Sequence, residues 1–207
     1  MGKLAFGRDL RKLGSGNAGG TNAFRVFGWK AGVPTVIVDV GKGVLATLVI
    51  SRLPGPAPLS REALELIAGC AAVVGHVWTV FAGFRGGKGV GTAAGVMVSL
   101  YPLPIAICAA LFAIVLLATG IVSVASLSAA LAFPAALVAL SATGVLEVPP
   151  ILLWFSIPVV VLIFFTHRSN IRRLIAGTEN RFARLAVFRR LAARLRSPRG
   201  PAGPRAS

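Results

Sequence analysis

Long apolar runs restrict most strongly what this sequence can fold into. Runs rich in Val, Leu, Ile, Ala and Gly lie near residues 32–51, 63–82, 90–118, 121–141 and 149–166. Four of them have the length, about 17–25 residues, that a helix needs to cross ~30 Å of hydrocarbon. A soluble domain could not bury so much apolar sequence, since 56% of the residues are hydrophobic and the mean hydropathy is +0.81. We therefore expect an all-α, polytopic transmembrane helical bundle.

The run at residues 90–118 decides the number of crossings. It contains Tyr101-Pro102-Leu103-Pro104 near its centre, and prolines so placed end or sharply bend a helix. Read as one helix, the run gives five spans. Divided at the prolines, it gives six, near residues 32–51, 63–82, 90–101, 103–118, 121–141 and 149–166.

The distribution of charge favours six spans. The chain has 22 Lys and Arg against 6 Asp and Glu, with six of the basic residues in residues 1–30 and eleven from residue 168 onward. Basic segments stay on the cytoplasmic side of a membrane, and only an even number of spans leaves both ends there. This distribution is a topology signal and not a nucleic-acid surface, so we expect no nucleic-acid partner.

Under this topology the Arg85/Lys88 loop is also cytoplasmic, and only Arg52 and Arg61 lie outside, beside acidic residues. We expect no cleavable signal peptide, because the first thirty residues are polar, basic and glycine-rich. Residues 1–179 form the predicted membrane domain, and residues 180–207 a basic cytoplasmic tail. In this tail, residues 181–196 have the pattern of an amphipathic helix lying on anionic headgroups, and residues 197–207 are typical of disorder.

The two cysteines give no sign of a disulfide or metal site. Cys70 and Cys108 stand alone in apolar stretches, without paired spacing. We expect both to be packing residues, and we predict no metal and no cofactor.

The first polar cluster is Leu-Gly-Ser-Gly-Asn-Ala-Gly-Gly-Thr-Asn-Ala-Phe-Arg at residues 13–25. Its glycines fit G-x-G-x-x-G, but no strand precedes it and the acidic residue twenty positions on lies inside an apolar span, so we exclude a dinucleotide fold. The glycines instead expose N–H groups to an anion. Further donors come from Ser15, Thr21, Asn22 and Arg25.

The second cluster is Phe-Arg-Gly-Gly-Lys-Gly-Val-Gly-Thr at residues 84–92. It is not a Walker A motif, because Ala82 stands where that motif needs glycine, and Gly89 follows Lys88. A glycine turn carrying Lys88 at the start of a helix binds anions. The alternative is helix packing through Gly87, Gly91 and Gly95, which explains the glycines. Packing leaves Arg85 and Lys88 unexplained, so we expect substrate contact there.

The third cluster, residues 166–179, follows the last span directly. His167 and Asn170, three positions apart, share a helix face at the same depth as the other clusters. Ser123, in the turn between two late spans, falls on this side as well. Asp39 and Lys42, inside a span, most simply pair and neutralise each other.

In combination and order, these motifs resemble the bacterial acyl-phosphate:glycerol-3-phosphate acyltransferase family. The resemblance extends from about Gly7 to Glu179. It rests on Gly-Ser-Gly-Asn with Thr-Asn and a later Arg, Asp39 with Lys-Gly, Gly-His-x-Trp with Gly-Gly-Lys-Gly-Val, and His-Arg-x-Asn-Ile-x-Arg-Leu with Gly-x-Glu. The family usually has seven spans, so the resemblance implies that its first helix has no counterpart among the six spans here.

The resemblance implies transfer of a fatty acyl group from acyl phosphate to glycerol 3-phosphate, giving lysophosphatidic acid and phosphate, as a first step of phospholipid synthesis. It places the chain in the bacterial cytoplasmic (inner) membrane, with the active site facing the cytoplasm among membrane lipid. The basic face would also suit a soluble acyl-phosphate-producing enzyme as partner. The implied catalytic residues are Ser15, Arg25, Lys88 and His167. The implied substrate-binding residues are Gly14, Gly16, Asn17, Thr21, Asn22, Gly86, Gly87, Gly89, Ser123 and Asn170.

The chemistry needs no covalent nucleophile, since acyl phosphate is already activated, and the sequence has no G-x-S-x-G elbow. His167 is either a general base or only a ligand contact. A membrane transporter for a small phosphorylated or anionic solute is the main alternative, but carriers place polar groups near mid-membrane. A non-catalytic scaffold is a further alternative, and it leaves the glycine clusters without purpose.

Overall fold

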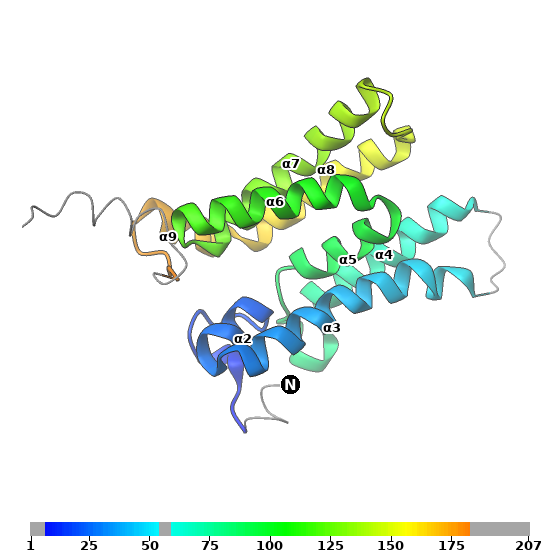
Figure 1. Cartoon of the computed structure of the whole chain (residues 1–207). Coiled ribbons are helices and arrows are strands. Elements are labelled where there is room, and N and C mark those ends of the chain that lie inside the picture. Colours follow the sequence, from blue (N-terminus) through cyan, green and yellow to red (C-terminus); the bar gives the residue numbers. More distant parts are fainter. Residues whose placement is uncertain (1–6, 54–58, 183–207) are drawn as a thin grey trace, which may run out of the picture.

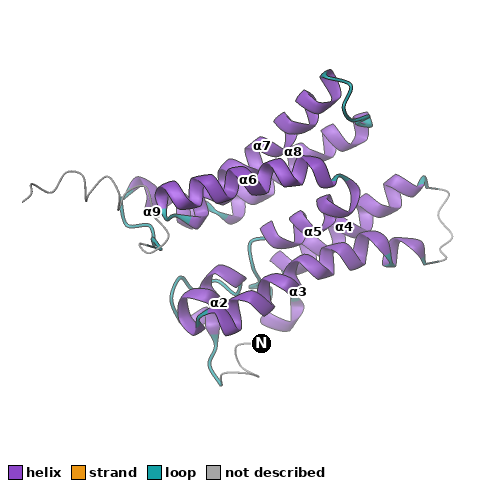
Figure 2. Ribbon diagram, in the orientation of Figure 1, coloured by secondary structure: helices purple, strands orange, loops and turns teal. Residues whose placement is uncertain are grey.

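The computed structural model describes residues 7–53 and 59–182, and every regular element in these two ranges is helical (Figures 1 and 2). The expected all-α class is therefore confirmed. Short 3-10 turns lie at Leu10–Lys12, Ile50–Arg52 and Val80–Ala82. The α-helices are α2 (Gly20–Phe27), α3 (Trp29–Leu48), α4 (Arg61–Val77), α5 (Val90–Leu100), α6 (Pro102–Thr119), α7 (Val122–Ala142), α8 (Pro150–Thr166) and α9 (Arg168–Ile175).

The helices form two groups that meet at the α5–α6 turn (Figure 1). In one group α3 packs against α2, α4 and, most extensively, α5; in the other, α7 packs against α6 and α8. Buried apolar side chains from α4 to α8 make one core across both groups. Its members are Leu66, Val73, Ala93, Val96, Met97, Cys108, Phe133, Leu137 and Leu152. Cys108 is thus a packing residue, and both cysteines are free thiols.

Most of the apolar surface of the long helices faces outward. In the four helices long and apolar enough to cross a membrane, only 11–39% of the most apolar window is buried inside the protein. Ile37 on α3 and Ile114 on α6, for example, are 63% and 60% exposed. Outward aliphatic side chains are what a bilayer requires of helices that span it. The architecture is that of a multi-pass membrane protein.

The apolar run at residues 90–118 is divided, with Tyr101 alone between α5 and α6. Pro102 takes the first position of α6, where its missing N–H costs nothing. At 11 residues, α5 is about 16 Å long, too short to cross a bilayer alone. Its end nevertheless shares a small cavity with Glu62 of α4 and Leu152 of α8, so it reaches the level where those helices begin.

The number of crossings stays a prediction. Four helices pass the length and hydropathy test, and α8 with α9, bent by 58° between them, could make a fifth span. The α5–α6 hairpin runs from the polar end toward the far end and back, the path that two of the six expected spans would follow.

The α3–α5 crossing is unusually close, because two glycines leave room for it. A Cβ on Gly95 would collide with the carbonyl oxygen of Val40, and a Cβ on Gly43 with that of Thr92. A Cβ on Gly91 would lie 3.2 Å from Cβ of Asp39. The close approach therefore explains Gly91 and Gly95 and brings Asp39 beside the first turn of α5.

The predicted amphipathic helix at residues 181–196 lies outside the described residues except for Arg181 and Phe182, which have no regular structure. The predicted disorder of residues 197–207 lies outside them entirely. The N–H of Phe182 donates to the carbonyl oxygen of Gly120 at 2.7 Å. This bond ties the segment after α9 to the turn between α6 and α7.

Candidate active site

A cavity of about 220 Å³ opens at the end of the bundle where the three polar clusters meet. It is smaller than the ~300–1,000 Å³ of sites for drug-sized ligands, so it suits a small polar molecule. Its polar lining comes from α2 and the loop before it, from α3, from the end of α4 and the turn before α5, from the first turns of α7, and from the α8–α9 boundary and the residues after α9. The charged and hydrogen-bonding side chains among these residues are Ser15, Asn17, Thr21, Arg25, Asp39, His76, Lys88, Ser123, Ser126, His167, Asn170, Glu179 and Asn180.

The loop before α2 is organised by Asn22, which is 1% exposed. Its amide nitrogen donates to the carbonyl oxygens of Leu10, Leu13 and Asn17 at 2.9–3.1 Å, and its Oδ1 accepts from the N–H of Ser15 at 2.9 Å. Because its hydrogen-bonding capacity is used within the loop, Asn22 does not line the cavity. The structure gives it the task of presenting Ser15, and not the substrate contact that the sequence suggests.

Gly14 and Gly16 shape the same loop without lining the cavity. Both have positive φ, +59° and +73°. A Cβ on Gly14 would also collide with Oδ1 of Asn22, so only glycine allows that bond. Their contribution is to the backbone that carries Ser15 and Asn17, both of which line the cavity.

Lys88 sits in the turn that leads into α5. Gly89 caps that helix with φ of +85°, and the hydroxyl of Thr166 donates to the carbonyl oxygen of Lys88 at 3.0 Å. The Lys88 ammonium donates to Oδ1 of Asn170. Burial is the main cause that lowers the pKa of Lys88, to about 8; Glu179 opposes this shift, and Arg173 and Arg25 add to it. A cation so deprived of water binds an incoming anion strongly.

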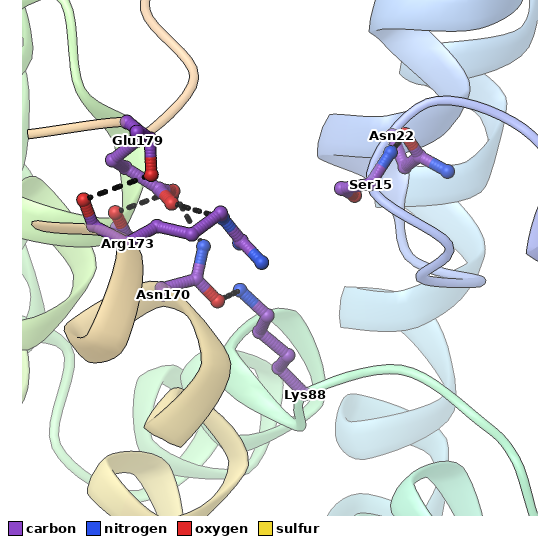
Figure 3. Close-up of polar contacts among 8 residues, drawn as sticks. Ser15, Asn22, Lys88, Asn170, Arg173 and Glu179 are labelled. Carbon is purple, nitrogen blue, oxygen red and sulfur yellow. Dashed lines mark hydrogen bonds and ion pairs between the residues drawn. The ribbon is translucent and has the colours of Figure 1, made fainter. Parts of the chain in front are cut away.

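Glu179 joins three side chains on the same wall of the cavity (Figure 3). Its carboxylate accepts from Nδ2 of Asn170 at 2.5 Å, from the hydroxyl of Ser123 at 3.0 Å and from Nε of Arg173 at 2.6 Å. Burial alone would raise the pKa of Glu179, but these hydrogen bonds outweigh it and lower the pKa. The ionised carboxylate thereby fixes Asn170 and Ser123, and Figure 3 shows Ser15 facing this group from the opposite side.

His167 lies at the junction of α8 and α9 and is 2% exposed. Its Nδ1 is 2.7 Å from the carbonyl oxygen of Ile163, an acceptor, so Nδ1 carries the proton and Nε2 keeps its lone pair. Burial first, and then the charge of Lys88, lowers the pKa of His167 to about 4. The imidazole is therefore neutral and offers an acceptor to the cavity.

Arg25, in the last turn of α2, stands on the other side of the cavity. Its guanidinium lies 5.1 Å from the ring centroid of Phe182, a cation–π contact. Burial lowers its pKa, with smaller effects from Glu179 and Arg173. Within the described ranges this guanidinium makes no hydrogen bond to another residue, and Arg25 lines the cavity.

The structure gathers most of the site residues that the sequence indicates. Nine of them line the cavity, namely Ser15, Asn17, Thr21, Arg25, Lys88, Gly89, Ser123, His167 and Asn170. Gly86 and Gly87 precede Lys88 in the same turn, and their N–H groups donate to the carbonyl oxygens of Val77 and His76 at the end of α4. Arg85, which the sequence pairs with Lys88 as a substrate contact, is exposed and outside the cavity lining.

Asp39 and Lys42 do pair, with Nζ to Oδ1 at 2.8 Å. The sequence missed that His76 joins them and that Asp39 and His76 both line the cavity. It likewise missed the bridging role of Glu179. The position of His76 in the last turn of α4, just before the glycine turn, is a sequence signal that could have placed it near the site.

This arrangement can hold anions and a hydroxyl group close together. Cations approach the cavity from both sides, Arg25 from α2 and Lys88 from the turn before α5, while His167 supplies a neutral acceptor. None of the three cavity serines hydrogen-bonds to a histidine within the described ranges, and no group of three or more metal-binding side chains is found there. Polar groups gather at one end of the bundle, unlike the mid-membrane sites of carriers.

Comparison with known proteins points to one family. The glycerol-3-phosphate acyltransferase family matches residues 1–177. The glycerol-3-phosphate acyltransferase of Chlorobium phaeobacteroides (strain BS1) is 45% identical over 205 residues, with 87% of each chain covered, and that of Chlorobaculum tepidum is 43% identical with 88% covered.

Two crystal structures of PlsY (YgiH), an integral membrane glycerol 3-phosphate acyltransferase, resemble this fold at 34% identity. The glycerol 3-phosphate form gives a TM-score of 0.75, with 90% of each chain covered. The lysophosphatidic acid form gives 0.70, with 90% of this chain and 92% of that chain covered.

Proposed function

Since this chain belongs to the glycerol-3-phosphate acyltransferase family, we propose that its acyl donor is an acyl phosphate and that the cavity holds the phosphates of both substrates. The chain is a multi-pass membrane enzyme that acylates glycerol 3-phosphate. One observation carries the proposal: Arg25 and Lys88 reach the same cavity from separate elements, next to a neutral histidine acceptor. Such a site suits a reaction in which two phosphates must lie close together.

The donor's phosphate is assigned to Ser15, Arg25 and Lys88. The N–H donors of Arg25 and the partly desolvated ammonium of Lys88 would stabilise the charge that grows on the departing phosphate. The backbone around Gly14, Gly16, Gly86 and Gly89 supports these side chains. The acyl chain is too large for this cavity, so it would extend past apolar residues such as Val36 and Phe112, which line the cavity on α3 and α6.

Glycerol 3-phosphate is assigned to the opposite wall, where Ser123, Asn170 and His167 lie. Asn170 and Ser123 are held by Glu179, so they are preorganised for a ligand. Nε2 of His167 would accept a hydrogen bond from the attacking hydroxyl and aim it. With a pKa near 4, His167 is too weak a base to keep the proton at neutral pH.

The proposed step is a direct acyl transfer. The C1 hydroxyl oxygen of glycerol 3-phosphate bonds to the acyl carbon while the bond from that carbon to the phosphate oxygen breaks. The hydroxyl proton ends on a phosphate group, either that of the acceptor or the one released. The products are 1-acyl-glycerol 3-phosphate and inorganic phosphate, and no acyl-enzyme is formed.

The site end of the bundle is proposed to face the cytoplasm of a bacterial inner membrane. Most described Lys and Arg lie at this end, while Arg52 and Arg61 lie at the other. The same basic face would allow a soluble enzyme that makes acyl phosphate to dock. In cells expressing Arg85→Cys or Arg61→Cys, each with Cys70 and Cys108 replaced by alanine, an impermeant thiol reagent should label only the Arg61→Cys variant; the reverse would contradict the orientation.

The experiment that tests the proposed donor uses the purified chain in lipid vesicles, supplied with labelled glycerol 3-phosphate. Acyl phosphate should give labelled 1-acyl-glycerol 3-phosphate and an equal amount of inorganic phosphate, and omission of either substrate should stop both. Acyl-CoA should give neither product. Labelled product from acyl-CoA but not from acyl phosphate would refute the donor while leaving the acyltransferase activity intact.

A further inference from the structure

Three ionisable side chains cluster where α3 passes the end of α4. The Lys42 ammonium donates to Oδ1 of Asp39 at 2.8 Å and also contacts Nδ1 of His76. Oδ1 of Asp39 lies 3.2 Å from the same Nδ1, and the His76 side chain is 8% exposed. Asp39 and Lys42 need only each other to be neutral inside an apolar helix. Charge neutralisation therefore does not explain why His76 contacts this pair.

The pair holds the imidazole of His76 at its Nδ1 edge. The Lys42 ammonium contacts Nδ1, and Oδ1 of Asp39 lies 3.2 Å from the same atom. Asp39 in turn holds the ammonium in place on α3. The pair thus sets the orientation of the imidazole.

The other edge of the ring lies against Gly87. A Cβ on Gly87 would overlap Nε2 and Cε1 of His76. Gly87 is not among the residues with positive φ, so the backbone itself would accept alanine there, and it is the imidazole that requires glycine. The N–H of Gly87 also donates to the carbonyl oxygen of His76 at 3.1 Å, and that of Gly86 to Val77 at 3.0 Å.

We propose that Asp39 and Lys42 position His76, and that His76, packed on Gly87, fixes the turn that presents Lys88 to the donor phosphate. The inference rests on the proposed function, because that function assigns Lys88 its task. The three side chains act as positioning residues through Lys88. The close α3–α5 crossing at Gly91 and Gly95 makes this possible by holding Asp39 next to the first turn of α5.

The first test removes the charges of the pair together in Asp39→Asn/Lys42→Met. Loss of two charges from a span does not hinder membrane insertion, so the variant is expected to insert and to unfold at the wild-type temperature. Because a displacement of about 1 Å can cost about 100-fold in rate, we expect kcat to fall by about 10–100-fold. The KM for glycerol 3-phosphate should change little, since Ser123 and His167 lie on other helices.

The matched control is Arg61→Gln/Glu65→Gln, which removes an exposed ion pair of 2.9 Å from α4, away from the cavity. It should keep the wild-type kcat. A wild-type kcat in Asp39→Asn/Lys42→Met would overturn the proposal, because the pair would then only neutralise itself. A loss of activity matched by a lower unfolding temperature would also overturn it, since that indicates a structural role alone.

A second test asks whether His76 and Gly87 act as one unit. Gly87→Ala and His76→Ala should each lower kcat, the first by pushing the ring away and the second by removing it. In the double variant the methyl group occupies space that the ring has vacated, so its kcat should be no lower than that of His76→Ala. If the loss of kcat in the double variant equalled the product of the two single losses, the contact between His76 and Gly87 would not be the cause of either loss.

Failure of the proposed donor would be visible separately, in the wild-type enzyme. If that enzyme were inactive with acyl phosphate but used another acyl donor, the same kcat comparisons would be made with that donor. The positioning proposal would then stand or fall on the same ratios.

Discussion

Replacement of Lys88 by methionine removes the cation at the centre of the site while preserving the length of the side chain. Two unit charges 4 Å apart interact by about 4 kcal/mol at an effective dielectric constant of about 20, and loss of one donor that stabilises a transition-state anion costs about 100–1,000-fold in rate. The pKa of Lys88, lowered to about 8 mainly by burial, indicates a partly dry site, so the estimate applies here. We therefore expect kcat for Lys88→Met to fall by about 100–1,000-fold.

The assay is release of inorganic phosphate by vesicle-reconstituted enzyme at saturating acyl phosphate and glycerol 3-phosphate. Arg85→Met is the matched control, because it removes a cation from the same turn at an exposed position outside the cavity lining. This control should retain kcat within about twofold, as expected for a solvent-exposed charge. If Lys88→Met kept more than a third of the wild-type kcat with its unfolding temperature unchanged, the assignment of Lys88 to the departing phosphate would be wrong.

Three further predictions follow from the same geometry. The pKa of Lys88 is lowered to about 8, so its charge is present below about pH 8 and lost above it. Above that pH, kcat/KM should therefore fall, by up to about tenfold per pH unit. A flat profile of kcat/KM from about pH 7 to about 9.5 would contradict this. Asn22→Leu should lower the free energy of unfolding by about 2–4 kcal/mol, because it leaves the N–H of Ser15 and three carbonyl oxygens without their partner. The control is Thr21→Ala, at an exposed neighbouring position. Equal unfolding temperatures for the two variants would contradict the prediction. Glu179→Gln should raise the KM for glycerol 3-phosphate about three- to tenfold, because the ionised acceptor shared by Asn170 and Ser123 is lost; an unchanged KM would show that these two residues do not need it.

Most of the long helices could be predicted because apolar length alone defines them. The break at Tyr101 was predictable for a local reason too, since Pro102 cannot continue a helix from α5. The short helix α2 could not be predicted. It begins at Gly20, a residue that disfavours helix, yet it packs along α3, with Gly20 directly against Val36. Tertiary contact overrides local propensity there, and a single segment of sequence does not contain that contact.

The site was predictable to the extent that its residues lie at helix ends on one membrane face. Lys88, Asn170 and Ser123 each follow or precede an apolar run, so topology alone brings them to the same depth. Depth does not determine which of them touch. Arg85 has the same charge as Lys88 and lies in the same turn, yet it is exposed and outside the cavity lining. Contacts such as Glu179 to Ser123 depend on how α7 and α9 meet, which periodicity does not encode.

The site lies where the two helix groups meet, so the contacts between the groups also determine how rigid the site is. Around the cavity, the groups are joined by polar contacts of the Lys88 turn: its ammonium with Asn170 of α9, and its carbonyl oxygen with Thr166 of α8. Apolar packing joins the groups deeper, in the core shared by α4 to α8. Hydrogen bonds are directional where aliphatic packing is not, so at the seam they set distances that the core alone would leave loose. The turn that presents the principal cation is therefore also the element that aligns the two walls of the cavity.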